Sequence, residues 1–86
     1  MALKILFTKT AQKQYQYWIE KDNKVLKKIN ELIKEIQTTP YEGKGKPEAL
    51  KFNFTGLWSR RINQEHRLVY KIDNDLIYII QCRYHY

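Results

Sequence analysis

Cysteine, proline and glycine are all scarce in this chain of 86 residues, which contains one cysteine, two prolines and three glycines. The single Cys82 has no partner within the chain for a disulfide, which is typical of the reducing cytoplasm. No apolar run approaches the ~20 residues that cross a membrane, and the apolar start Met1–Phe7 is too short for a signal peptide. We therefore expect a cytoplasmic location and no membrane partner.

Acidic residues are the minority among the charged ones. Nine Asp and Glu stand against sixteen Lys and Arg, which gives a net charge of +7. This excess favours an anionic partner such as nucleic acid, a membrane surface or an acidic protein. Many small proteins are simply basic, so charge alone does not decide among these partners. Hydrophobic residues make up 43% of the chain, enough for a small core, and we expect residues 1–86 to form one ordered domain.

Hydrophobic spacing predicts a strand, two helices, a loop and four further strands. The strands are expected at residues 2–7, 48–53, 57–63, 67–73 and 75–85. The first helix begins after Thr8 or Thr10 and is interrupted at 22–23. Its apolar positions are Ala11, Tyr15, Trp18 and Ile19, and those of the second helix are Val25, Ile29, Leu32, Ile33 and Ile36. The lysines and glutamates of the second helix read as a solvated face, and residues 40–47 read as a loop.

The order of these elements predicts an α+β fold, in which two N-terminal helices pack on one face of a mostly antiparallel, twisted sheet of about four to five strands. If the turns at 63–66 and 73–75 close hairpins, Asn63 lies opposite Arg67 and Ile72 opposite Leu76. Residues of like parity then share a face. The even positions form the face toward the helices: Trp58, Ile62, Leu68, Tyr70, Ile72, Leu76, Tyr78, Ile80 and Cys82, with Arg60 as the exception.

The odd positions form an open, basic face. They are Ser59, Arg61, Asn63, Arg67, Lys71, Gln81, Arg83 and His85, with Val69, Ile77 and Ile79 among them. An arginine fork donates two hydrogen bonds to one phosphate, and the nearby Tyr41, Tyr84 and Tyr86 offer rings on which unpaired bases stack. Arginines and aromatic rings on a sheet suit single-stranded RNA better than a DNA groove. For Arg61 and Arg83 taken singly, a surface that is polar only for solubility explains the pattern equally well.

The histidines differ in their surroundings. His85 stands between Tyr84 and Tyr86 on the basic face, whereas His66 lies in a predicted turn and reads as an ordinary polar residue. RNA cleavage needs a base for the 2′-hydroxyl, a cation for the phosphorane and an acid for the leaving 5′-oxygen. A carboxylate, an arginine and a histidine fill these roles without a metal. No group of His, Cys, Asp and Glu has metal-ligand spacing, so we expect no cofactor, and GKGK at 43–46 lacks the nucleotide-loop motif.

Five stretches carry a resemblance to a known family. They read KINELIK at 28–34, PYEGKGKPE at 40–48, LWSRRI at 57–62, EHRLVY at 65–70 and CRYHY at 82–86. In these stretches the chain resembles the YoeB/Txe-type toxins of the RelE superfamily, from residue 17 to the end. The resemblance implies a RelE-like microbial ribonuclease fold and a toxin of a type II toxin–antitoxin pair. It also implies an endoribonuclease that cleaves mRNA in the ribosomal A site, and a cognate acidic antitoxin as its partner. Whether the chain forms a homodimer stays open.

The same resemblance implies roles for particular residues. It implies Glu48 as the general base, Arg67 as the arginine that stabilises the transition state, and His85 as the general acid. It implies Lys51 and Arg61 as positive residues around the scissile phosphate, and Tyr86 as a terminal tyrosine that helps to set the substrate site. Without the resemblance, Glu48 reads as a loop carboxylate paired with a lysine. Two other interpretations stay open: a basic RNA- or ribosome-binding module without catalysis, and a subunit whose basic face docks an acidic protein.

Overall fold

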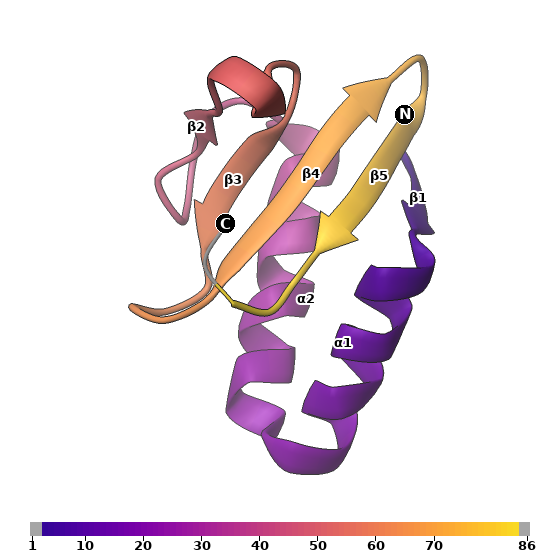
Figure 1. The fold of residues 1–86 in the computed structure, drawn as a ribbon, viewed down its shortest axis with the longest axis vertical. Coiled ribbons are helices and arrows are strands. Elements are labelled where there is room, and N and C mark those ends of the chain that lie inside the picture. The colour runs from indigo at the N-terminus through magenta and orange to yellow at the C-terminus, as the bar shows by residue number, and fades with distance from the viewer. Residues whose placement is uncertain (1–2, 85–86) are drawn as a thin grey trace.

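The computed structural model describes residues 3–84 as a five-stranded sheet with two helices on one side (Figure 1). The elements are β1 Lys4–Phe7, α1 Lys9–Lys21, α2 Asn23–Thr38, β2 Glu48–Ala49, β3 Trp58–Arg61, β4 Arg67–Asp73 and β5 Leu76–Gln81, with a 3-10 turn at Phe52–Phe54. The strand order is β1-β5-β4-β3-β2, in which only the β1–β5 pair is parallel. The predicted α+β fold and the mostly antiparallel sheet are confirmed.

Two polar side chains set the helix boundaries. The Thr8 hydroxyl accepts a hydrogen bond from the Ala11 N–H at 3.1 Å and so caps α1. The Asp22 carboxylate accepts from the N–H groups of Lys24 and Val25 at 3.1 and 3.3 Å, which caps α2 directly after α1 ends. The two helices therefore form a hairpin. Within residues 3–84, neither helix combines the length and apolar character that crossing a membrane requires.

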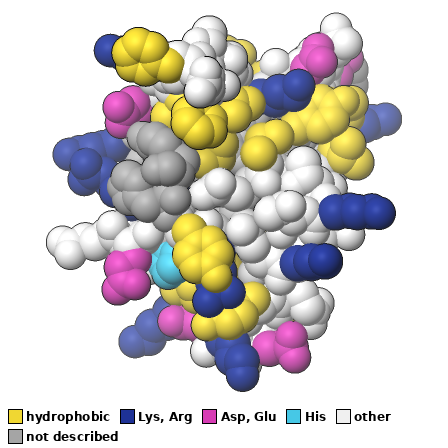
Figure 2. All heavy atoms as spheres, viewed as in Figure 1, with side chains coloured by type: hydrophobic (Ala, Val, Ile, Leu, Met, Phe, Trp, Pro, Cys, Tyr) yellow, Lys and Arg dark blue, Asp and Glu magenta, His cyan; other side chains and the backbone are white. Residues whose placement is uncertain are grey.

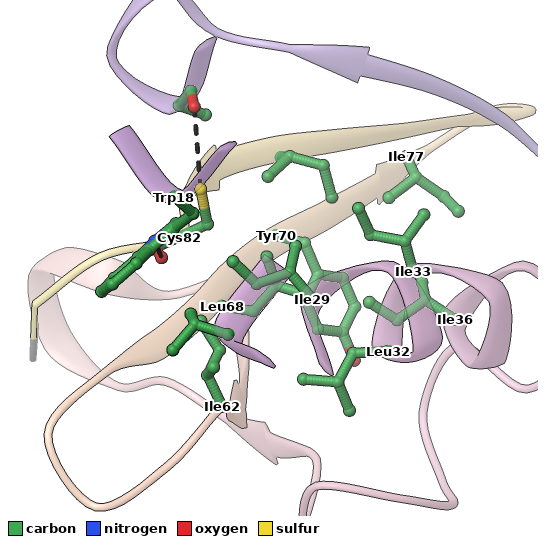
Figure 3. Packing of buried hydrophobic residues seen from close by; sticks show 13 residues of the cluster. Trp18, Ile29, Leu32, Ile33, Ile36, Ile62, Leu68, Tyr70, Ile77 and Cys82 are labelled. Carbon is green, nitrogen blue, oxygen red and sulfur yellow. Dashed lines mark hydrogen bonds between the residues drawn. The ribbon is translucent and has the colours of Figure 1, made fainter. Parts of the chain in front are cut away.

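The core lies between this helical hairpin and one face of the sheet. All five predicted apolar positions of α2 are buried. In α1, Ala11 and Trp18 are buried, whereas Ile19 is 45% exposed, so that prediction is wrong. Trp18 lies beside Cys82 in Figure 3 and donates its indole N–H to the Cys82 carbonyl at 2.8 Å. The Cys82 thiol in turn lies 3.6 Å from the Ala11 carbonyl, which ties the end of β5 to α1.

The register between β4 and β5 differs from the predicted one. Ile72 lies opposite Ile77 rather than Leu76, because the turn has two residues and Asn74 adopts a φ of 57°. A slip of one residue moves every side chain to the other face, so Ile77 and Ile79 are fully buried. The half-buried positions are Leu76, Tyr78 and Ile80. A bulge at Val69/Tyr70 then restores the predicted parity, with Gln81 opposite Val69 and Cys82 buried.

Two predicted strands each end four residues earlier than expected. The strand expected at 48–53 ends at Ala49 and gives way to the 3-10 turn, in which Phe52 has a φ of 58° and is 90% exposed. The strand expected at 75–85 ends at Gln81, and residues 82–84 bend. Alternation along a strand stops where the strand stops. It therefore carries no information on the faces of residues 83–85.

Arg60 is the polar exception on the helix-facing side, as predicted, and it is fully buried. Its guanidinium donates to the Tyr70 hydroxyl at 3.1 Å and to the carbonyls of Thr39, Glu42 and Lys44. The Tyr70 hydroxyl donates onward to the Pro40 carbonyl at 2.7 Å. Burial raises the pKa of Tyr70, although its hydrogen bond with Arg60 acts in the opposite direction. Arg60 thus fixes the loop that leads into β2.

Candidate nucleic-acid interface

The outer face of the sheet, which the helices leave uncovered, brings three predicted site residues together. Glu48 pairs with Ser59 across β2 and β3, and Arg61 pairs with Arg67 across β3 and β4. Side chains of directly paired residues point to the same face, so Glu48, Arg61 and Arg67 share it. The two rows are separated by two residues along β3, about 7 Å. Figure 2 looks onto this face and shows Lys and Arg side chains around its rim.

Glu48 stands at one side of this face without a partner in the described chain. Both Glu48 and Lys51 are exposed, and neither makes an ion pair or side-chain hydrogen bond with any residue in 3–84. The interpretation of Glu48 as a carboxylate paired with a lysine therefore finds no support there. Glu48, Lys51, Phe52 and Phe54 line a hollow of about 340 Å³. The carboxylate is open to a ligand that enters from the outer face.

A second hollow, of about 550 Å³, is lined by three cations. They are Arg61 and Arg67 from the sheet and Lys28 from α2, and the described lining includes no carboxylate. The Nη1 atom of Arg67 donates to the carbonyls of three loop residues, Asn63, Gln64 and His66. Its Nε and Nη2 groups make no hydrogen bond within the described chain. A guanidinium held on one side and free on the other is suited to receive a phosphate.

Lys28 was not predicted as a site residue. The sequence places it among alternating charges on α2, and that pattern is typical of a solvated helix face. Its position beside Arg61 and Arg67 depends on how α2 packs against the end of β3, which no local spacing reveals. Lys28 adds a third positive charge to the hollow.

Arg83 lies elsewhere than the predicted outer face. Its guanidinium carbon lies 3.5 Å from the ring centre of Tyr17 in α1 and 4.5 Å from that of Tyr84. Arg83 is thus stacked between two rings and does not line the hollow of Arg61 and Arg67. The physical reason is that β5 ends at Gln81, so alternation no longer applies. The proposed phosphate-binding role of Arg83 stays a prediction.

The last two predicted site residues, His85 and Tyr86, lie outside the described residues. The chain is described up to Tyr84, which is 54% exposed and has a φ of 69°. The Tyr84 carbonyl accepts a hydrogen bond from the Arg67 N–H at 3.0 Å. The segment that leads to His85 is therefore attached directly to the proposed transition-state arginine.

The remaining titratable candidate is the thiol. Burial raises the pKa of Cys82 to about 12, so the thiol stays protonated and is no nucleophile at neutral pH. Between Leu3 and Tyr84, no three His, Cys, Asp or Glu side chains gather where they would hold a metal ion. Among the predicted site residues that the structure describes, those open to a ligand are Glu48 and the cations of the two hollows.

Comparison with known proteins identifies the family to which the chain belongs. The family model described as YoeB-like toxin of bacterial type II toxin-antitoxin system matches residues 7–86. The chain belongs to this toxin family. Toxin YoeB of Escherichia coli strain K12 is 54% identical to our YoeB-like toxin over 84 residues, which are 98% of this chain and 100% of that protein.

Solved structures agree with this assignment. A YoeB dimer from Staphylococcus aureus superimposes on our YoeB-like toxin with a TM-score of 0.93 and 52% identity, covering 100% of both chains. The toxin in a heterotetrameric YoeB–YefM toxin–antitoxin complex from the same organism gives 0.91 at 52% identity, again over 100% of both chains. The resemblance and the fold predicted from the sequence are confirmed.

Proposed function

We propose that this YoeB-like toxin is an endoribonuclease of the cytoplasm that cleaves mRNA in the ribosomal A site and thereby stops translation. The observation that carries the proposal is the outer face of the sheet. There the Glu48 carboxylate, which has no side-chain partner within residues 3–84, shares a surface with Arg61 and Arg67, whose row lies roughly 7 Å further along β3. The net charge of +7 favours association with ribosomal RNA.

The proposed reaction is an attack within the RNA chain itself. Glu48 takes the proton of the 2′-hydroxyl, and the 2′-oxygen attacks the neighbouring phosphorus. The bond from phosphorus to the 5′-oxygen breaks, leaving a 2′,3′-cyclic phosphate on one fragment. The 5′-oxygen of the other fragment takes a proton from His85 and leaves as a hydroxyl. The base receives one proton and the acid gives one, so the step balances without a metal or a cofactor.

The cations supply the electrostatic part of this mechanism. The phosphorane carries more negative charge than the ground state, so donors aimed at its oxygens lower the barrier. Arg67 has unused Nε and Nη2 donors in the described chain, and its Nη1 is fixed by loop carbonyls, which keeps the fork in place. Lys51 and Arg61 are both exposed and are suited to hold the phosphates that flank the scissile one. The proposed role of Tyr86 is to help set the substrate site.

We further propose two protein partners. The Staphylococcus aureus relatives form a YoeB dimer and a YoeB–YefM toxin–antitoxin complex, and a 52% identical chain with the same fold is suited to corresponding partners. The cation-lined hollow of Lys28, Arg61 and Arg67 would attract an acidic antitoxin segment. Such a segment silences the nuclease by covering the proposed phosphate site.

Replacing Glu48 by glutamine tests the proposed base. The change keeps the shape of the side chain but removes its ability to take a proton, so cleavage on programmed ribosomes should slow by roughly 10²–10⁴-fold. The matched control is Glu20→Gln, an exposed carboxylate on α1 that should leave the rate unchanged. A message with 2′-deoxyribose at the scissile nucleotide should resist the wild-type protein.

The outcomes separate the competing functions. A Glu48→Gln variant that cleaves at the wild-type rate would remove Glu48 from the mechanism. Cleavage of the deoxy message would exclude attack by the 2′-hydroxyl. Ribosome binding by the wild-type protein without any cleavage would favour the non-catalytic binding module instead.

A further inference from the structure

We propose that His66 is a positioning residue of the toxin, which holds the backbone at Tyr84 and thereby fixes the point from which the chain continues to the proposed general acid, His85. The inference rests on the proposed function, because it takes His85 as the general acid. It assigns a role to a histidine whose place in a turn suggested none. The assignment comes from the hydrogen bonds and ring contacts around Tyr84.

The backbone of Tyr84 is attached on both sides to two consecutive residues of the chain. Its N–H donates to the Nδ1 atom of His66 at 2.8 Å. Its carbonyl accepts from the N–H of Arg67 at 3.0 Å. The first bond depends on a side chain and the second on the backbone. A substitution that removes the acceptor of His66 therefore removes the first bond and leaves the second. The chain thus enters its last two residues from a point fixed beside Arg67.

The imidazole of His66 is itself held in one orientation. Its ring stands edge-on to Trp18, with ring centres 4.8 Å apart and planes at 75°. Its Nε2 atom lies 3.9 Å from the Glu65 carboxylate, too long for a hydrogen bond. The His66 backbone N–H donates to the side chain of Asn63 at 2.8 Å, which fixes the turn below the ring. Nδ1 therefore serves as the acceptor for Tyr84, which requires an imidazole that carries no proton on that atom.

The conformation of Tyr84 indicates why such a hold is needed. Its φ of 69° lies in the left-handed region, which a tyrosine adopts rarely. A residue keeps this conformation only where its surroundings impose it, and such residues gather at functional sites. The surroundings here are the bond to His66, the bond from Arg67 and the guanidinium of Arg83, 4.5 Å from the Tyr84 ring centre.

Core formation does not account for these contacts. The Tyr84 side chain is 54% exposed, so little apolar surface is gained by holding it there. The hydrophobic core is complete without it and closes with Cys82. What the contacts do determine is the direction in which the chain leaves Tyr84. An acid must lie within hydrogen-bond reach of the leaving oxygen, so this direction bears on the rate of cleavage.

Two substitutions separate the hydrogen bond from the ring. His66→Asn places an amide oxygen close to the position of Nδ1 and can still accept from the Tyr84 N–H. His66→Gln carries its oxygen one carbon further, near the position of Nε2, and loses that bond. Both variants lose the same ring contact with Trp18. A difference between them therefore reports on the acceptor and not on packing, and thermal unfolding verifies that both are folded.

The first measurement is hydrogen exchange at the Tyr84 amide, followed by NMR on protein labelled with ¹⁵N-tyrosine. The amide should be protected in the wild-type protein and in His66→Asn, and should exchange freely in His66→Gln. Equal protection in all three proteins would overturn the hold of His66 on Tyr84. This measurement needs neither ribosomes nor cleavage.

The second measurement is cleavage on programmed ribosomes. His66→Gln should reduce the maximal rate by about 10²-fold with unchanged KM, as expected for a misplaced reacting group, and His66→Asn should recover most of the loss. In a protein that already carries His85→Gln, adding His66→Gln should cost nothing more, because the acid to be positioned is gone. Equal rates for the two His66 variants, or additive losses in the double variant, would overturn the positioning role.

The two measurements keep this inference distinguishable from the proposed function. A wild-type protein that cleaves no message would overturn the proposed function, and with it the catalytic half of the inference. The exchange measurement would still support or overturn the contact between His66 and the tail on its own.

Discussion

Replacing Arg60 by lysine should destabilise the toxin far more than the similarity of the two side chains suggests. Arg60 is fully buried, and its guanidinium donates four hydrogen bonds, one to Tyr70 and three to carbonyls of the loop that precedes β2. A lysine keeps the charge but lacks the planar fork with five donors, so it reaches only some of these acceptors. The others are left buried without a partner.

The size of the effect follows from the number of bonds. A hydrogen bond to a charged group contributes about 1.5–3 kcal/mol, and removing one partner from a buried charged network typically costs about 3–5 kcal/mol. If lysine loses two of the four bonds, the free energy of unfolding should fall by about 3–5 kcal/mol. That is a large share of the roughly 5–15 kcal/mol by which small domains are stable. Because this loop leads into β2, Glu48 at the start of β2 should also be held less firmly in place.

Urea unfolding followed by tryptophan fluorescence measures this loss. The matched control is Arg61→Lys, the next residue of β3, which is exposed and should change stability by less than about 0.5 kcal/mol. Tyr70→Phe removes the hydroxyl that links Arg60 to the Pro40 carbonyl, so its cost and that of Arg60→Lys should be less than additive. An Arg60→Lys variant within about 1 kcal/mol of the wild type would refute the idea that this network holds the loop.

Three further variants test the last residues of the chain, from Cys82 onward. Burial raises the pKa of Cys82 to about 12 from an ordinary value of 9.0, so the folded thiol stays neutral while the unfolded one ionises. This contribution of Cys82 to stability should be full below pH 9 and should fall by about 1.4 kcal/mol per pH unit from there toward 12. Cys82→Ala should therefore reduce the pH slope of urea unfolding between pH 9 and 11, and an unchanged slope would contradict the assignment. Deleting His85 and Tyr86 should leave a folded protein that still sediments with ribosomes but cleaves poorly, and His85→Gln should do the same with little change in thermal unfolding. Full activity in either protein would make His85 a bystander.

The parts of the fold that depend on local signals could be predicted from the sequence. The periodic apolar positions of α2 are all buried, and Asp22 both ends α1 and caps α2. The hairpin of β3 and β4 keeps the predicted parity, although Arg61 rather than Asn63 lies opposite Arg67. These features are decided by residues close to one another in the chain. Their physical causes are therefore visible in the sequence.

The register of β5 could not be predicted, because a single turn residue decides it. Asn74 takes up a positive φ, which shortens the turn to two residues and exchanges the faces of Leu76–Ile80. The sequence of three polar residues at 73–75 is equally compatible with a longer turn. The bulge that later restores the parity leaves no clear pattern either. Both features arise from the packing of the whole sheet.

The same distinction between local signals and tertiary packing applies to the site residues. Arg61 and Arg67 share a hairpin, and alternation places them together correctly. Glu48 joins them only through the pairing of β2 with β3. Lys28 reaches Arg61 and Arg67 because of how α2 is packed. His66 receives its hydrogen bond from Tyr84, which is 18 positions away in the chain. Such contacts between distant segments are set by tertiary structure and leave no local signal.

The place of β5 in the sheet also bears on when the toxin assumes its shape during synthesis. The strand translated last lies between β1, translated first, and β4, so Lys4 finds its partner only when Leu76 has been made. Pairings of such long separation form late and slowly, since a loop of most of the chain must close. A nascent chain still short of β5 has an edge at β4 and an unpaired β1. The ribosome that makes this toxin therefore carries an unfinished sheet until the codons of β5 have been read.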